Sequence, residues 1–475
     1  MNGLTYPEII QGGMGVNVSN WKLARAVSML GQQGTLSGVT LEKVMAVMLQ
    51  RGDAGGYLRK ALSAFPFPHI SKRVLDEFFV EGGVKKGRTL KKAPFFTTSP
   101  SSLLISLTVC ANYAFVWLAK EGHKNPVSIN FLEKIAMPHL FAIFGAMLAG
   151  VNFITMGAGI PLQIPGVISN FTVGKEAKYT IPVIGKNVTS FEMSFNPSQF
   201  FGAELEKVLP LEKPGFIPII ASNLLATIFV KKLPPGSVYG FVIEEPTAGG
   251  HNAPPRKFVL NEKGEPLPIY GEKDRVDYAA IKSLGLPFWI GGSYASPEKL
   301  KWAKSVGAKG IQVGTIFALC EESGMGSSLR QRIIDLAKND ELEVNTDMLV
   351  SPSGFPFKVV QLKGTISDKV VYGARVRVCN QRALVSLCER EDGTVGYRCA
   401  SEPVDSYIRK GGIITDTVGK GCLCNGLLST AGLGDEGEPP IVTLGDDTSF
   451  LQHVLANGRN TYSAKDAIAY LLGSV

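Results

Sequence analysis

Eight short apolar runs, most of them ending at a glycine or a polar residue, recur along the first two thirds of this 475-residue chain. Each run has the length of a buried strand, and most are followed by apolar residues at helical spacing. Strands that alternate with helices predict a parallel sheet. The eight runs lie near residues 9–13, 34–38, 126–130, 151–156, 215–222, 239–243, 286–292 and 310–314.

Eight such units predict an α/β protein with a (β/α)₈ TIM barrel, and an open doubly wound sheet is the alternative. We expect the barrel to occupy residues 1–338. In a barrel, ligands bind at the carboxyl ends of the strands. Helices are predicted for residues 20–30, with Ser19 or Asn20 as the cap, for 41–50 and 140–148, and for 297–306 behind Ser296.

Two parts of the chain lack this regularity. Residues 52–125, which hold paired glycines, several prolines and short basic clusters, are predicted to be an insertion after the second strand. The character of the sequence changes again beyond residue 338, so residues 339–475 are expected to form a C-terminal subdomain.

Composition excludes several classes of function. The net charge of +8 comes from scattered basic residues without interleaved aromatics, so we expect no nucleic-acid partner. Two long apolar stretches, 103–119 and 136–162, are interrupted by polar residues, which favours a buried helix and a strand over membrane spans.

Seven cysteines and no secretory pattern near residue 1 predict a reducing, cytoplasmic location. Cys379, Cys399, Cys422 and Cys424 lack the two-residue gaps of common zinc sites, so buried structural thiols are favoured over a metal site.

The sixth apolar run leads into the residues best suited to chemistry. Glu244 and Glu245 follow it directly, and Gly249 and Gly250 then precede His251. Of the five histidines only His251 stands at a strand end beside glycines, where an imidazole can act as a base. The two carboxylates could bind a ligand hydroxyl, orient the histidine or cap the turn.

The last two runs end in residues that suit a phosphate. Gly291 and Gly292 follow the seventh run, and Gly314 and Thr315 follow the eighth. In barrels these two loops commonly offer backbone N–H groups to a phosphate. A Rossmann site has no support, because no Gly-x-Gly-x-x-Gly follows the first run.

Several of these motifs, taken together, resemble one family. They occur in the order and context of the nitronate monooxygenase (former 2-nitropropane dioxygenase) family of FMN-dependent barrels, which also includes flavin-containing enoyl-ACP reductases. The resemblance covers roughly residues 5–330, and residues 351–357 look like the family's post-barrel segment. The motifs are residues 11–15 (QGGMG), 156–161 (MGAGIP), 245–251 (EPTAGGH), 291–292 (GG) and 312–315 (QVGT).

The resemblance implies FMN as the cofactor and a role for each matching residue. Gly13 and Met14 would lie against the flavin ring, Asn130 would contact the flavin, and Gly249 and Gly250 would admit it closely. The phosphate would be held by Gly291, Gly292, Gly314 and Thr315, with His251 as the catalytic base.

The implied activity is an FMN-dependent oxidoreductase, nitronate monooxygenase-like, that oxidises nitronates or a related carbon acid with oxygen. The alternatives are an NAD(P)H-dependent enoyl-thioester reductase and a non-catalytic flavin- or metal-binding protein. The expected partner is a small-molecule substrate, with an acyl thioester as one option, and a homo-oligomer is left open.

The chain departs from the family pattern just after the histidine. The family usually continues His-x-Gly, whereas residues 251–256 read HNAPPR. Arg256 could meet an anionic substrate or face solvent, and the insertion 52–125 could cover the barrel mouth. These departures suggest a substrate larger than a nitroalkane.

Overall fold

The computed structural model describes residues 6–262, 264–456 and 458–474. Eight strands form one sheet in the order β1-β12-β11-β8-β7-β4-β3-β2, and every pairing in it is parallel. They are β1 (Ile9–Gln11), β2 (Gly34–Ser37), β3 (Val127–Leu132), β4 (Phe153–Gly157), β7 (Gly215–Ile220), β8 (Phe241–Glu244), β11 (Phe288–Gly291) and β12 (Gly310–Val313). All eight coincide with the predicted runs.

The sheet closes on itself through the residue that precedes β2. Gln33 bridges Ile10 in parallel, with the Gln11 N–H donating to the Gln33 carbonyl at 2.9 Å and the Gln33 N–H donating to the Ile9 carbonyl at 3.1 Å. The first and last strands of the sheet are therefore joined. The predicted TIM barrel is confirmed, and the open-sheet alternative is wrong.

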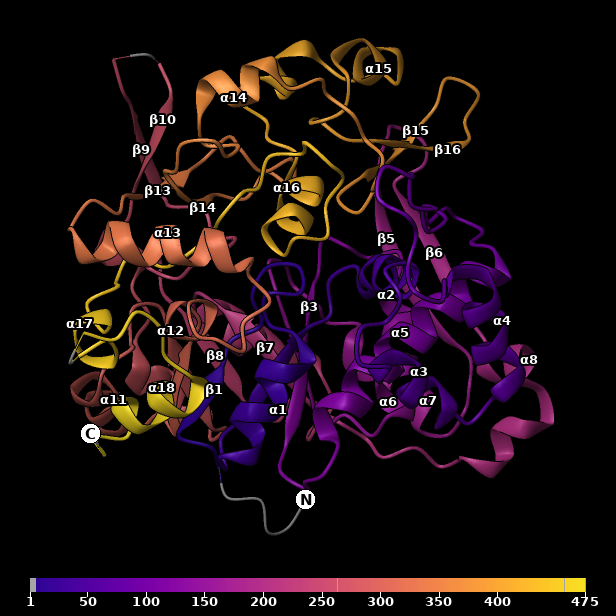
Figure 1. Cartoon of the computed structure of the whole chain (residues 1–475), viewed down its shortest axis with the longest axis horizontal. Coiled ribbons are helices and arrows are strands. Elements are labelled where there is room, and N and C mark those ends of the chain that lie inside the picture. The colour runs from indigo at the N-terminus through magenta and orange to yellow at the C-terminus, as the bar shows by residue number, and fades with distance from the viewer. Residues whose placement is uncertain (1–5, 263, 457, 475) are drawn as a thin grey trace.

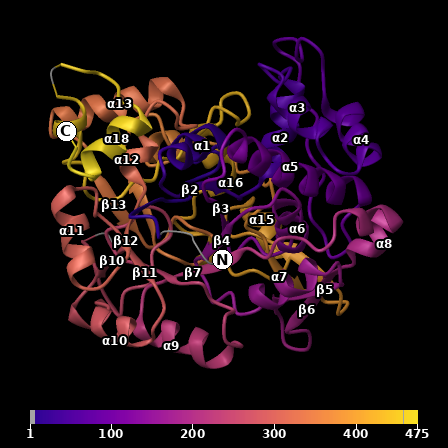
Figure 2. The same cartoon turned by 90° about the horizontal axis from the view of Figure 1, so that it is seen from below.

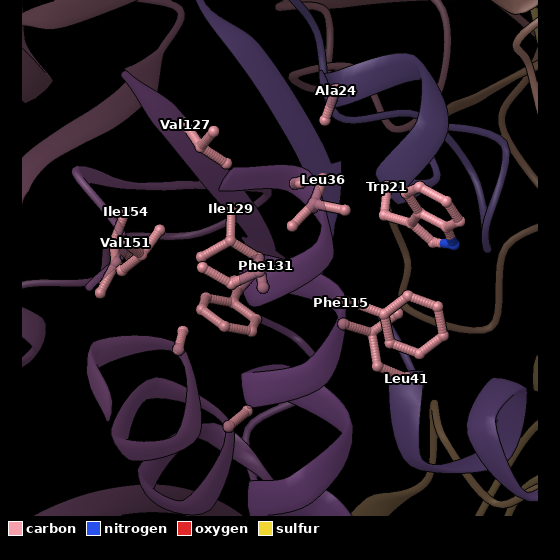
Figure 3. Packing of buried hydrophobic residues seen from close by; sticks show 14 of the residues in the cluster. Trp21, Ala24, Leu36, Leu41, Phe115, Val127, Ile129, Phe131, Val151 and Ile154 are labelled. Carbon is pink, nitrogen blue, oxygen red and sulfur yellow. The ribbon is translucent and has the colours of Figure 1, made fainter. Parts of the chain in front are cut away.

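Side chains that alternate along the strands build two separate apolar regions. Ile10, Phe153, Ile217, Val242 and Trp289 come from five different strands and fill the barrel interior. Other side chains of the barrel strands point outward to the surrounding helices, as Leu36 of β2, Val127 and Ile129 of β3 and Ile154 of β4 do in Figure 3. Trp21 and Phe115 approach that second region from the helical layer.

Helices surround the barrel (Figures 1 and 2). Asn20 caps α1 by accepting from the Leu23 N–H, and Ser296 caps α11 in the same way from Lys299, as predicted. The helices up to β12 are α1 (Trp21–Met29), α2 (Leu41–Gln50), α3 (Tyr57–Ser63), α4 (Pro68–Phe78), α5 (Ser102–Lys120), α6 (His139–Leu148), α7 (Ile164–Thr172), α8 (Pro197–Phe201), α9 (Asn223–Lys232), α10 (Tyr278–Ser283) and α11 (Pro297–Ser305). Those after β12 are α12 (Thr315–Ala318), α13 (Ser327–Lys338), α14 (Lys369–Ala374), α15 (Val404–Arg409), α16 (Leu423–Thr430), α17 (Leu451–Val454) and α18 (Ala464–Leu471).

The irregular segment 52–125 lies on the outside of the barrel. Its helix α5 packs against α1, α2 and α6, and α3 and α4 pack on α5 in turn. By length and composition α5 could cross a membrane, but 78% of its apolar window is buried within the protein. It is therefore accounted for as the buried helix that the sequence predicts.

The part of the chain after residue 338 spreads over the carboxyl ends of the barrel strands and then returns to the barrel wall (Figure 1). The hairpin β13 (Val344–Asp347) and β14 (Phe357–Val360) and the helix α16 lie above the barrel. The strands β15 (Ser386–Glu389) and β16 (Val395–Arg398) join β5 (Ala177–Ile184) and β6 (Ser190–Phe195) in a four-stranded sheet. Helix α18 then packs against α1, α11 and α12, and so takes a place in the helical layer of the barrel.

Two hairpins were not predicted from the sequence. One is the pair β5 and β6, which leaves the barrel between α7 and β7. The other is β9 (Lys257–Leu260) with β10 (Pro266–Ile269), which projects from the top of the molecule in Figure 1. Both are antiparallel excursions between consecutive barrel elements.

Candidate active site

The carboxyl ends of the barrel strands surround a cavity of about 210 Å³. The loops after β1, β8, β11 and β12 and the side chain of Asn130 on β3 form its walls. All ten residues predicted for the site lie on this one cavity: Gly13, Met14, Asn130, Gly249, Gly250, His251, Gly291, Gly292, Gly314 and Thr315. Chain folding therefore brings together residues up to three hundred positions apart.

The roof of the cavity comes from the region beyond residue 338. Leu423, Cys424 and Leu427 of α16 line it, as do Gln381, Ala383, Leu384, Thr443, Leu444, Gly445 and Asp447. Among the described residues that line the cavity, none falls between 52 and 125. The expectation that the insertion covers the barrel mouth is therefore wrong, because that segment packs on the barrel flank and the C-terminal region takes the covering position.

Glycines are required at this surface by close packing as well as by backbone conformation. A Cβ added to Gly13 would lie 2.3 Å from the Cβ of Asn130, so the two residues can meet only with glycine there. Gly292 has φ +108°, and its added Cβ would lie 3.0 Å from the Thr247 hydroxyl oxygen. A flat backbone surface results, which lets a planar ligand approach closely.

Hydroxyl groups gather around the loops after β11 and β12. Ser293 Oγ and Thr247 Oγ1 are buried and have no hydrogen-bond partner within the described part of the chain. Thr315 Oγ1 accepts from the Gly445 N–H at 2.9 Å, which leaves its own proton to donate. Ser293 also has φ +56°, an unusual conformation outside glycine. Donors without partners suit an oxyanion such as a phosphate.

His251 is held by the segment that follows the barrel. Its Nε2 lies 2.8 Å from Ser351 Oγ, and its ring packs edge-on against Phe357 with centroids 4.8 Å apart. Ser351 Oγ in turn lies 2.7 Å from Ser353 Oγ. Nδ1 has no hydrogen-bond partner among the described residues, and burial lowers the imidazole pKa to about 4. The ring is therefore neutral at pH 7, and Nδ1 is the nitrogen left to meet a ligand.

The two carboxylates after β8 have different surroundings. Glu244 lines the cavity, and burial raises its pKa to about 8, so it is largely protonated at neutral pH. Glu245 points away and accepts from the hydroxyls of Tyr278 and Tyr294. Neither carboxylate orients His251, a role that the Ser351 hydroxyl has instead.

The site also shows what the sequence could not reveal. Ser351, Thr443 and Gly445 reach the barrel loops from more than ninety residues away: Thr443 Oγ1 accepts from the Gly250 N–H at 2.7 Å. No local pattern marks Thr443 and Gly445, and the resemblance marked the segment 351–357 without a role for Ser351, because these roles depend on long-range packing. The Arg256 side chain is exposed and lines a different cavity, and its Nε lies 3.9 Å from Asp274 Oδ1.

The C-terminal cysteines form a group of their own. Cys379, Cys399, Cys422 and Cys424 line a small space behind the roof. All seven cysteines are free, and in the described residues no group of three or more histidine, cysteine or acidic side chains is arranged to hold a metal ion.

FMN is compatible with the residues that line the cavity. Gly13 and Gly314 line the cavity without side chains that would block a planar ring, and the unpartnered Ser293 and Thr247 hydroxyls mark a place where an oxyanion would supply acceptors. Asp447, a carboxylate that lines the cavity, is paired with Lys299 at 2.8 Å. Its negative charge is therefore offset.

Comparison with known proteins gives structural likeness but no family assignment. No family model and no curated protein matches the chain. FabK from Thermotoga maritima is similar over 99% of this chain and 96% of its own, with 16% identity and a TM-score of 0.41. A nitroalkane oxidase from Streptomyces ansochromogenes is similar over 99% and 97%, with 13% identity and a TM-score of 0.44. The enoyl reductase domain of MlnA from Bacillus amyloliquefaciens is similar over 99% and 96%, with 11% identity and a TM-score of 0.48.

Proposed function

We propose that the protein is an FMN-dependent oxidoreductase, nitronate monooxygenase-like, that oxidises a nitronate or a related carbon acid with oxygen. The observation that carries the proposal is the neutral imidazole of His251, which shares one cavity with a glycine surface and with the Gly292, Gly314 and Thr315 loops. A base, a flat surface and a place for a phosphate are the parts that such a reaction requires.

His251 removes the proton from the acidic carbon. Nε2–H donates to Ser351 Oγ, which passes its own hydrogen bond to Ser353 and leaves Nδ1 free to accept the substrate proton. The negative charge that develops on the substrate raises the imidazole pKa from its low value, because an opposite charge favours the protonated ring. Bound FMN supplies the electron acceptor for the resulting carbanion and the route to oxygen.

The roof and walls keep water from the reacting carbon. Leu423 and Leu427 of α16 close the cavity from above, and Phe357 supports the imidazole from the side. Exclusion of water strengthens the electrostatic interactions within the cavity.

A second candidate is an NAD(P)H-dependent enoyl-thioester reductase. The observation in its favour is Glu244, whose carboxyl lines the cavity in its protonated form at neutral pH. Reduction of an enoyl group needs a proton donor beside the hydride donor, and Glu244 holds such a proton.

The test is turnover by the purified protein after reconstitution with FMN. We expect a yellow protein that consumes oxygen with a nitronate in the absence of nicotinamide. With the parent nitroalkane, His251→Gln should lower kcat by about 10²–10⁴-fold while FMN stays bound. Ser351→Ala should lower kcat less and alter its pH profile, because it changes only the orientation of the ring.

Two results would overturn the proposal. A colourless protein that does not take up FMN contradicts the cofactor. Turnover that requires NADH or NADPH and an enoyl thioester, and ignores oxygen, favours the second candidate. Lys301→Ala, at an exposed residue of α11 that lines neither cavity, is the control and should leave both activities unchanged.

A further inference from the structure

One wall of the cavity carries polar side chains that the proposed chemistry does not use. Lys43 stands in the first turn of α2, Thr40 precedes that helix, and Gln381 comes from the roof. Each is more than nine-tenths buried, and each lines the cavity. Together they form a polar patch, which we call the Lys43 subsite.

The Lys43 ammonium has no counter-ion. Among the described residues it takes part in no ion pair and no hydrogen bond, and its Nζ lies over the Phe95 ring, 5.5 Å from the centroid. A buried ammonium is costly unless a partner neutralises it. The adjoining Glu42 acts on the ammonium only through space, so an anion entering the cavity would meet a positive charge that has no direct partner.

Thr40 adds two independent signs of a ligand. Its Oγ1 is buried without a partner in the described part of the chain, and its backbone has φ +54°, a strained conformation for a β-branched residue. Its side chain makes no capping hydrogen bond, so the first N–H groups of the ten-residue helix α2 have no side-chain acceptor at Thr40. The positive end of α2 and an unused hydroxyl therefore lie beside Lys43.

Barrel geometry relates this patch to the base. In the closed order β1-β12-β11-β8-β7-β4-β3-β2, strand β2, which leads into Thr40 and Lys43, stands four strands from β8, which leads into His251. The two groups thus approach one cavity from opposite sides of the barrel. A ligand whose reacting carbon meets His251 can extend its other end toward Lys43.

We propose that Lys43, Thr40 and Gln381 bind a carboxylate at the end of the substrate remote from the reacting carbon. The subsite holds one cation, one hydroxyl and one amide, which matches a singly charged, two-oxygen anion. The inference rests on the proposed function for the identity of that carbon, but the anion site can be tested without turnover.

Burial and the ionisable groups near Lys43 act on its pKa in opposite directions. Burial lowers the pKa most, Glu42, Cys424 and Cys379 raise it, and Lys92 lowers it. Glu42 adjoins Lys43, and burial raises the pKa of that carboxyl, which reduces its negative charge. A bound carboxylate would stabilise the ammonium in place of a protein counter-ion.

The experiment compares butyrate with butyramide, which has nearly the same shape and no charge. Binding of each to the FMN-loaded protein is measured by calorimetry and by the change in the visible flavin spectrum. We expect butyrate to bind at least tenfold more tightly than butyramide, and Lys43→Met to abolish that difference. Lys43→Arg should keep part of it, and Lys22→Met, an exposed lysine on α1, should keep all of it.

A second variant guards against misfolding. Thr40→Gly suits the positive φ and removes the whole side chain with its hydroxyl, so it should weaken butyrate several-fold while FMN content stays the same. Equal binding of butyrate and butyramide to the wild type overturns the proposal. Loss of FMN from Lys43→Met also overturns it, as does binding of inorganic phosphate in place of butyrate. Either result would mean that Lys43 binds a phosphate. Failure of nitronate turnover with butyrate binding intact would instead contradict only the proposed function.

Discussion

Two side chains of one loop are held in their uncharged forms by the same cause. Burial lowers the pKa of His251 to about 4 and raises that of Glu244 to about 8. The loop thus presents an unprotonated base and a protonated acid to the cavity at pH 7. Environments that move two pKa values in opposite directions are typical of sites that transfer protons.

Glu244 gives a prediction about stability. Its pKa is higher in the folded state than in the unfolded state, so between about pH 4.5 and pH 8 the folded protein binds more protons. The contribution of Glu244 to the free energy of unfolding therefore falls as pH rises through that window. Glu244→Gln removes this loss. Relative to the wild type, we expect the free energy of unfolding of the variant to rise by about 3–5 kcal/mol between pH 5 and pH 9.

Urea unfolding at the two pH values measures this gain, with the exposed Glu176→Gln as the control. Parallel pH dependence in Glu244→Gln and the wild type would contradict a protonated Glu244.

At the residue scale the sequence indicated the strand-end members of the site but not their supports. Gly292 and His251 follow strands and were indicated by the pattern of strand ends, whereas Gly13 and Asn130, which lies within β3, were indicated by the resemblance to the flavin family. Ser351 and Thr443 contact the His251 loop through their hydroxyls, and beside them the Lys358 N–H donates to the Gly250 carbonyl at 2.9 Å. These contacts depend on tertiary packing. Lys43 was not singled out, because a lysine in a helical run gives no sign of burial.

At the scale of single elements the barrel strands were predictable from the sequence, and the hairpins β5–β6 and β9–β10 were not. Each barrel strand is an apolar run bounded by turn residues, and such runs indicate which segments are strands and in which order they follow along the chain. The strand β5 does alternate buried and exposed residues along Ala177–Ile184, which is a usable signal, but Pro182 within it obscures the pattern. Along β9 every residue is exposed, although Phe258, Val259 and Leu260 are apolar, so the strand has no alternation of apolar and polar residues to detect.

Two glycines in different elements give opposite predictions. Gly166 lies on the exposed side of α7 with nothing within 4 Å of an added Cβ, so Gly166→Ala should raise the free energy of unfolding by about 0.5–1 kcal/mol. Gly292→Ala places a Cβ on a backbone with φ +108° and against Glu245 and Thr247. We expect it to lower stability by more than 1 kcal/mol and to weaken FMN binding at least tenfold.

Thermal unfolding and cofactor titration of the two variants check this pair. Equal effects of the two substitutions would contradict a specific backbone requirement at Gly292.

At the scale of the whole molecule, the region beyond residue 338 cannot be separated from the barrel. It forms the roof of the cavity, and its helix α18 contacts α1, α11 and α12. Ala464, Ala467, Ile468 and Leu471 are buried in that contact, and the Tyr462 hydroxyl donates to the Ile316 carbonyl at 2.6 Å. Roof and barrel should therefore unfold together.

Substitution within α18 tests this cooperation. Ile468→Ala should cost about 2–4 kcal/mol and lower the midpoint of a single transition, observed alike by circular dichroism and by flavin release. Leu472→Ala, at the exposed end of the same helix, should cost less than about 1 kcal/mol. A second transition in Ile468→Ala, with FMN retained through the first, would indicate that the roof unfolds alone.

The position of α18 has a consequence for how the molecule is made. The β1 strand and α1 are synthesised long before the helix that covers their flank, which comes only after the roof. Between the synthesis of β12 and that of α18, a nascent chain therefore carries a barrel with one uncovered apolar side. Flavin capture should then wait until α18 has been made, because the cavity has neither its roof nor its full wall until that late helix docks.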